Sequence, residues 1–86
     1  MVPMNVLVTQ PANEYASQRV ILFVDGKEMG GVGVGESLLL HSDHSPCVIS
    51  AICGFSRASI SLKADAELQI RWALNTPMEL VAAKSK

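Results

Sequence analysis

Residues 19–35 read RVILFVDGKEMGGVGVG, in which a run of apolar, β-forming residues meets Asp25-Gly26 and a second extended run follows. Asp-Gly between two such runs is among the strongest short-range signals for a β-hairpin, because a type I′ turn needs positive φ at both central residues. The stretch therefore predicts two strands, over residues 19–24 and 27–34, joined by a tight turn.

Further runs along the chain also have the composition of strands. They cover residues 5–9, 37–40, 47–53, 58–63 and 67–74. The clearest alternation places Leu68, Ile70, Trp72 and Leu74 on one face of the last run, opposite mostly polar residues. Such a pattern suits an antiparallel sheet with one face in water. We expect one domain over residues 1–86, an all-β antiparallel sandwich of about seven strands with Trp72 and Phe55 in its core.

The C-terminal tail carries a different signal. Thr76-Pro77-Met78-Glu79 matches a capping box with proline at the first helical position, and Leu80-Val81-Ala82-Ala83 follows it. This pattern predicts a short C-terminal helix of about two turns. A last strand is the alternative.

The composition excludes some classes of protein. Hydrophobic residues make up 49% and charged residues 17% of the chain, which excludes a disordered segment. Seven Lys and Arg stand against eight Asp and Glu, so the chain has no large basic surface for nucleic acid. Low charge with high apolar content in a small domain favours self-association, and we expect a homo-oligomer.

The N-terminal residues Met1–Asn5 lack the basic and apolar segments of a signal peptide. The longest apolar run, residues 20–24, is far shorter than the roughly 20 residues that span a bilayer. We therefore expect no membrane segment in this chain and a cytoplasmic location. A surface domain trimmed of its leader or anchor is the alternative.

Part of the chain has the order of elements of a known group of domains. The elements are Val24-Asp25-Gly26-Lys27, Gly30, the Gly35-Glu36 turn, the strand Ser37–Leu40 and the run Cys47–Ser56 with Phe55 as its aromatic residue. This order resembles small, mostly uncharacterised bacterial and phage β-sandwich domains, and its D-G-K-x-x-G portion is similar to PEGA-type surface modules. The resemblance implies a fold and carries no catalytic residues. The chain departs from it at Ser42–Pro46, where such domains usually have P-G-x-H or P-x-G.

The glycine-rich run resembles a phosphate loop only in its spacing. Gly30–Ser37 matches G-x-x-x-x-G-K-S, but Glu36 stands where a lysine reaches the phosphates, and a carboxylate there repels them. No cofactor is therefore expected. The run has little side-chain bulk and no proline or lysine to block strand pairing, so it predicts a partner-binding sheet edge. An edge that another strand of the same domain covers is the alternative. The residues of this predicted edge are Gly30, Gly31, Val32, Gly33 and Val34.

His41, His44 and Cys47 have a spacing that occurs in zinc sites, and Cys53 follows. An extended strand from Cys47 to Cys53 separates its ends by roughly 20 Å, too far for one shared ion or for a disulfide. Both thiols are therefore expected in the core. The remaining candidate ligands for a metal or small molecule are His41, Asp43 and His44 in the polar loop.

The sequence contains no Gly-x-Ser-x-Gly elbow and no recognisable nucleophile with its base, so no enzymatic activity is predicted. The leading hypothesis is a protein-interaction or assembly module that pairs with itself or another protein, such as a small phage or bacterial binder or inhibitor. A metal- or ligand-binding domain built on the His41–His44 loop is the alternative. A PEGA-like surface module is a third.

Overall fold

The computed structural model describes residues 3–12, 18–73 and 76–82, and within these ranges it contains eight strands and no helix. The strands are β1 (Met4–Thr9), β2 (Val20–Val24), β3 (Lys27–Val32), β4 (Ser37–Ser42), β5 (Cys47–Cys53), β6 (Ser56–Leu62), β7 (Ala66–Ala73) and β8 (Thr76–Ala82). None of these described residues forms a helix with the length and apolarity of a membrane span.

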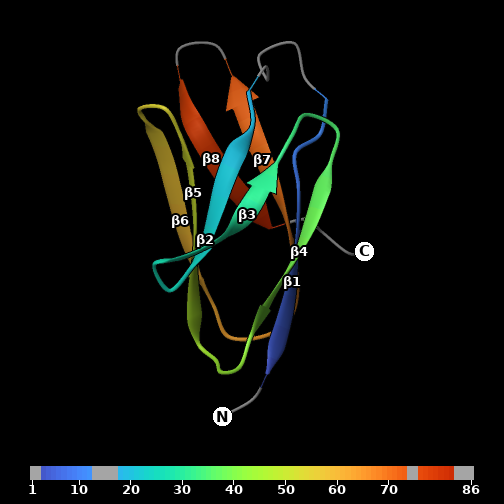
Figure 1. The fold of residues 1–86 in the computed structure, drawn as a ribbon, viewed down its shortest axis with the longest axis vertical. Helices are drawn as coiled ribbons and strands as arrows, with labels where there is room; N and C mark the ends of the chain where they lie inside the picture. Colours follow the sequence, from blue (N-terminus) through green and yellow to red (C-terminus); the bar gives the residue numbers. More distant parts are fainter. Residues whose placement is uncertain (1–2, 13–17, 74–75, 83–86) are drawn as a thin grey trace.

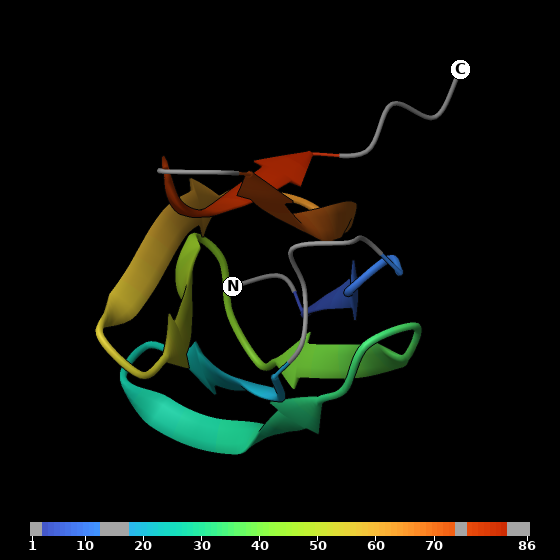
Figure 2. The same cartoon turned by 90° about the horizontal axis from the view of Figure 1, so that it is seen from above.

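The strands form two four-stranded sheets that pack face to face (Figure 1). Sheet A has the order β4-β1-β7-β8, and sheet B has the order β3-β2-β5-β6. Figure 2 looks along the long axis and shows the sheets curving toward each other at both sides, where β6 approaches β8 and β3 approaches β4. The radius of gyration is 12.2 Å, close to the roughly 12 Å expected for a globular chain of this length. The all-β sandwich is confirmed.

The hairpin predicted from Asp25-Gly26 is present. Val24 and Lys27 are direct partners across a two-residue loop. Asp25 has a φ of 51° and Gly26 a φ of 85°, so both central residues are left-handed, as a type I′ turn requires. The turn residues therefore determine the register in which β2 meets β3.

The predicted C-terminal helix is wrong, because Thr76–Ala82 forms strand β8. It pairs with β7 in antiparallel register, with Ile70 opposite Leu80. Met78 is buried in the core and Leu80 packs against it, so both of these alternate residues face inward. A neighbouring strand satisfies the backbone and buries these side chains, which an isolated two-turn helix does not do. The strand alternative is confirmed for residues 76–82, and Ala83 lies outside the described residues.

Sheet A is also not entirely antiparallel. Strands β1 and β7 run in parallel, with Val6 opposite Ala66 and Val8 opposite Leu68. The connection after β6 passes from sheet B to sheet A at the lower end in Figure 1, where β1 also begins. Both strands therefore enter the sheet from the same end, and the expectation of a fully antiparallel sandwich is corrected.

The core lies between the two sheets and is built from alternate residues of the strands. Leu68 and Ile70 are buried, as their alternation predicts, and Trp72 packs partly buried against the core. Cys47 and Cys53 are also buried. The buried apolar residues are Met4, Val6, Val8, Val20, Leu22, Val24, Val32, Leu40, Cys47, Ile49, Ala51, Cys53, Leu68, Ile70 and Met78.

The prediction that Phe55 lies in the core is wrong. Its relative exposure is 109%, so its ring stands entirely in solvent. Cys53 and Ser56 are direct partners, which makes Gly54-Phe55 a two-residue hairpin loop. Gly54 has a φ of 61°, as the first central residue of a type II′ turn requires. The strand ends at Cys53, as predicted, and the glycine turn places Phe55 at the tip of the hairpin.

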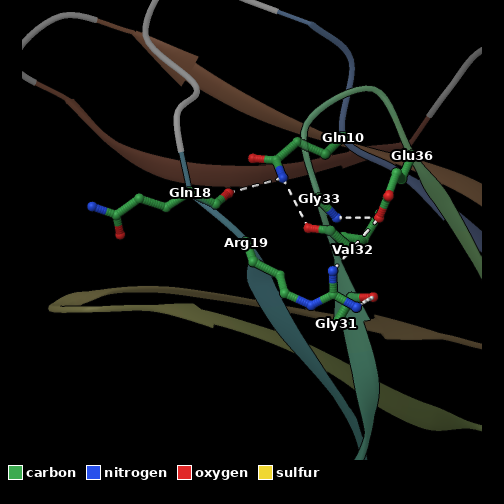
Figure 3. A network of polar contacts seen from close by, with 7 residues as sticks. All are labelled: Gln10, Gln18, Arg19, Gly31, Val32, Gly33 and Glu36. Atoms are coloured by element: carbon green, nitrogen blue, oxygen red, sulfur yellow. Dashed lines mark hydrogen bonds and ion pairs between the residues drawn. The ribbon is translucent and has the colours of Figure 1, made fainter.

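Gln10 is a fully buried polar residue that joins the two sheets. Its amide nitrogen donates to Val32 O in β3 of sheet B at 3.0 Å and to Gln18 O, just before β2 of the same sheet, at 3.2 Å (Figure 3). Its amide oxygen accepts the indole N–H of Trp72 from sheet A at 2.7 Å. The amide therefore meets donors and acceptors from both layers, and its burial leaves none of its polar atoms unpaired.

Replacement of Gln10 by Met is expected to lower the free energy of unfolding by about 2–4 kcal/mol. The thioether has similar volume but leaves the Trp72 N–H and the Val32 carbonyl without their amide partner. Urea denaturation followed by Trp72 fluorescence measures the change. Gln69→Met is the matched control, because Gln69 lies between the buried Leu68 and Ile70 of β7 and its side chain therefore points to the outer face, so a change within about 0.5 kcal/mol is expected. Equal losses in the two variants would contradict the joining role of Gln10.

Candidate interaction edge

The residues of the predicted glycine-rich edge are divided between a strand and a turn. Gly30, Gly31 and Val32 lie in β3, an edge strand that pairs only with β2 among the described residues. Gly33 and Val34 lie in the turn after it, where Glu36 N donates to Gly33 O at 3.1 Å. The side chain of Val32 is fully buried. The partner-binding role of this stretch remains a prediction, and the side chain of Val32 is not available for it.

The end of β3 is capped by side chains of the same chain (Figure 3). Arg19 Nη2 donates to Gly31 O at 3.2 Å, and Gly33 N donates to Glu36 Oε1 at 2.8 Å. A Cβ on Gly31 would lie 2.7 Å from Arg19 Nε, so the glycine allows the guanidinium to lie over the strand. The Glu36 carboxylate also takes an amide N–H of the kind that a phosphate loop offers to phosphate. The sequence predicts a free glycine-rich edge, whereas in the structure the side chains of Arg19 and Glu36 cap the backbone groups at its end.

The start of β3 has other obstacles to pairing. Leu22 faces Gly30 and Phe23 faces Glu28, so Met29 is the extra residue of a β-bulge. Lys27 and Glu28 beside it are exposed and charged. Bulges and charged residues are the usual means by which a sheet edge avoids pairing with another chain. Strand β3 is thus a guarded edge.

Strand β4, the neighbouring edge in sheet A, has an open backbone. Its ladder with β1 extends from Gln10 N, which donates to Glu36 O at 3.0 Å. Bonded and non-bonded pairs alternate along an antiparallel ladder, so every second residue of β4 directs its N–H and C=O away from β1. These residues are Ser37, Leu39 and His41. No side chain among the described residues caps these groups, in contrast to β3.

The outer face of β4 is apolar at its centre. Leu39 is 64% exposed and lies opposite the half-buried Leu7 of β1. Hydrogen bonds flank this leucine pair on the same face. They join Thr9 Oγ1 to Ser37 Oγ at 2.8 Å and His41 Nδ1 to Asn5 Oδ1 at 3.0 Å. A shallow hollow of about 480 Å³, to which Ala66 and Ala82 contribute, borders the leucines. The strand itself, SLLLHS, contains no Lys, Arg, Asp or Glu.

The loop after β4 does not assemble the predicted metal site. His41 Nε2 lies 3.2 Å from Asp43 Oδ1, whereas His44 Nε2 lies 2.9 Å from Asp25 Oδ2. The residues line a hollow of about 260 Å³ between β3 and β4. Within the described ranges, no three or more His, Cys, Asp or Glu side chains are placed to hold a metal ion. His41, Asp43 and His44 are thus divided between two imidazole–carboxylate pairs.

Asp25 has a structural task in addition to forming its turn. Its Oδ1 accepts from Val48 N at 2.9 Å, and its own N–H donates to Val48 O at 2.8 Å. With His44 on its second oxygen, the carboxylate ties the β2–β3 turn to β5 and to the β4–β5 loop. Hydrogen-bond partners are thus already present for both Asp25 oxygens.

The two cysteines are free, buried thiols. Cys47 Sγ lies 3.7 Å from Met4 Sδ, and Cys53 Sγ lies 3.2 Å from Gln18 Oε1. Burial raises the pKa of the Cys47 thiol, the negative charge of Asp25 raises it further, and a hydrogen bond with Ser42 partly offsets both. A buried thiol with a raised pKa is a poor nucleophile and a poor metal ligand. The prediction that both cysteines are core residues is confirmed.

No family model, no curated protein and no solved structure matches this chain. The resemblance to PEGA-type modules therefore remains a prediction.

Sequence reasoning missed Leu39 as an exposed residue and Arg19 as a cap. The run Leu38-Leu39-Leu40 carried a signal for the first, because alternation in a strand obliges the middle leucine to face away from its neighbours. The second had no local signal. Arg19 reaches Gly31, twelve positions along the chain, only because the hairpin brings them side by side.

The Glu36 cap can be tested with two matched substitutions. Glu36→Ala is expected to lower the free energy of unfolding by about 1 kcal/mol, since it removes the acceptor for Gly33 N. Glu36→Gln retains an acceptor oxygen and is expected to change it by less than about 0.5 kcal/mol. The ion pair with Arg19 contributes little, because it spans 3.7 Å between side chains that are 62% and 60% exposed. Urea denaturation measures both variants, and equal destabilisation would show that charge, not the hydrogen bond, is responsible.

The raised pKa of Cys47 predicts a loss of stability at alkaline pH. Its contribution is fully present below the ordinary thiol pKa of 9.0, since the thiol is then neutral in both states. As pH rises further, the unfolded chain ionises first, and the contribution is lost as pH passes through the raised pKa of the folded state. Cys47→Val should show a smaller decrease in unfolding free energy between about pH 7 and about pH 10 under reducing conditions. Identical pH dependence in the two proteins would contradict the burial effect.

Proposed function

We propose that this protein is a non-enzymatic interaction or assembly module that binds a protein chain by strand addition to the β4 edge. The observation that carries the proposal is the outward-facing backbone of Ser37, Leu39 and His41 on an uncharged edge strand. In strand addition, main-chain hydrogen bonds supply affinity and alternate side chains supply specificity. The exposed Leu39, with its neighbouring hollow, supplies an apolar contact at the centre of such a strand.

The glycine-rich residues 30–34 support this edge from the side. A Cβ on Gly30 would lie 3.4 Å from Leu38 Cδ2, an ordinary van der Waals distance, so β3 and β4 lie side by side there. Leu38 packs partly buried against the core beneath the open backbone of β4. We therefore propose that β4 is the strand that pairs with a partner, and that residues 30–34 lie beside it without pairing.

The polar groups of the His41–His44 loop favour a structural task over catalysis. Ser42 Oγ donates to the backbone carbonyl of His44 at 2.8 Å rather than to an imidazole nitrogen. The nearest polar partners of the two imidazoles are carboxylates and the Asn5 amide. A nucleophile needs a base within hydrogen-bond reach, and these contacts do not supply that arrangement.

A small phage or bacterial binder or inhibitor would use the same edge, in the cytoplasm or as a trimmed surface domain. Strand addition requires only that a partner presents an extended segment. The organism and the compartment in which this protein works do not alter the test.

Two matched bait proteins test the proposal in a native lysate. Leu39→Lys places a charge on the pairing strand and is expected to reduce the recovery of a specific partner, another protein or a second copy, by about tenfold. Val48→Lys places the same charge on an exposed residue of β5, away from the edge, and should leave recovery unchanged. Mass spectrometry quantifies what each bait retains relative to wild type.

A third bait, Val34→Lys, separates β4 from the glycine-rich turn. Loss of the partner with Leu39→Lys alone supports pairing through β4, whereas loss with Val34→Lys alone assigns binding to the turn. Equal recovery with all three variants would overturn the proposal. Unchanged unfolding transitions of the baits confirm that the substitutions act at the surface.

A further inference from the structure

We infer that the strand added to β4 is β4 of a second copy of this chain, in antiparallel register about a two-fold axis at Leu39. The inference rests on the proposed function and names its partner. An antiparallel pair of identical edges forms a closed, isologous dimer, because each strand offers its partner the same surface. Two copies of sheet A would then form one continuous sheet.

The alternation of the backbone selects the register. Ser37, Leu39 and His41 direct their N–H and C=O groups outward, so these residues must form the hydrogen-bonded pairs of the new ladder. Centring the axis on Leu39 places Leu39 opposite its own copy and Ser37 opposite His41 of the second copy. All outward groups of these three residues are then paired, giving about six hydrogen bonds across the junction.

The side chains suit this arrangement on both faces of the sheet. Leu7 is already the cross-strand neighbour of Leu39, so the dimer would extend the pair into a row of four leucines on the outer face. On the inner face, Leu38 of each copy would lie opposite Leu40 of the other. The residues brought together include no Asp, Glu, Lys or Arg, so no like charges are opposed.

The guarded edge beside β4 favours a dimer over continued growth. Once both β4 strands are paired, β3 of each copy retains its Arg19 and Glu36 caps and the bulge at Met29. The remaining edge strands are β8 of sheet A and β6 of sheet B. These two strands lie against each other, which restricts access to both. A single second copy therefore covers the β4 edge, and the dimer presents no further open edge strand among the described residues.

Cysteine cross-linking tests the register with the purified full chain. Antiparallel hydrogen-bonded partners have Cα atoms about 5.5 Å apart, within the range of a disulfide. Leu39→Cys should therefore form a disulfide-linked dimer under mild oxidation. Ser37→Cys should not link to itself, since the two copies of this residue would be separated by about 14 Å along the strands. Mixing Ser37→Cys with His41→Cys should yield the linked heterodimer.

Wild-type protein is the control for the buried thiols of Cys47 and Cys53, which should give no linked dimer. Sedimentation across a dilution series provides the second measurement. Leu39→Lys, which opposes two charges at the axis, should raise the dimer dissociation constant by about tenfold or more, and Val48→Lys should not. Because Leu39 is exposed, its replacement should leave the fold intact, which thermal unfolding verifies.

The outcomes separate this inference from the proposed function. Efficient linking of Leu39→Cys together with weakened association of Leu39→Lys supports the dimer. Linking of Ser37→Cys to itself in place of Leu39→Cys would overturn the register. A dimer unaffected by Leu39→Lys, or a monomer at every concentration without linking, would overturn self-pairing. In the last case, loss of another protein from the Leu39→Lys bait would still support the strand-addition edge.

Discussion

The buried side-chain amide of Gln10 is the polar contact that joins the two sheets at the end of the sandwich where the end of β1 meets the β3–β4 turn. It is completely buried, yet all of its hydrogen-bonding groups have partners, drawn from β3, from the residue at the approach to β2 and from Trp72 in β7. Its main chain adds two more links, to Glu36 and to Gly35. A small domain has a thin apolar core, so a satisfied polar bridge between layers adds specificity where burial alone is limited. The hydrogen bonds of this amide thus join the two sheets at this end of the sandwich.

The same region determines how the sheet edges differ. The main chain of Gln10 holds the β3–β4 turn, and that turn presents Glu36 to Gly33 and brings it near Arg19. One consequence is that β3 ends in a set of side-chain caps. The other is that β4 leaves the turn with its outward backbone groups uncapped. Natural β-proteins rarely leave such an edge exposed, which is why the proposed interaction is placed on β4 rather than on the glycine-rich strand beside it.

Local chemistry made some elements predictable. Asp25-Gly26 determined a type I′ turn because few residues tolerate two successive left-handed conformations, and the alternation of Leu68 and Ile70 determined which face of β7 is buried. Thr76-Pro77-Met78-Glu79 misled for the opposite reason. Its capping signal is local, whereas the strand that replaces the helix is stabilised by β7, a neighbour that appears only once the chain has folded.

The candidate interaction edge shows the same division between local and long-range effects. The sequence by itself determined an all-β sandwich, its Asp25-Gly26 hairpin and the inward position of both cysteines, because these follow from backbone preferences and a period of two. Only the tertiary structure decided which strands became edges, that Arg19 and Glu36 cap β3, that β4 remains open, and that His41 and His44 take separate carboxylates. Strand order and side-chain pairing join residues that are distant in the chain, and no local pattern encodes them.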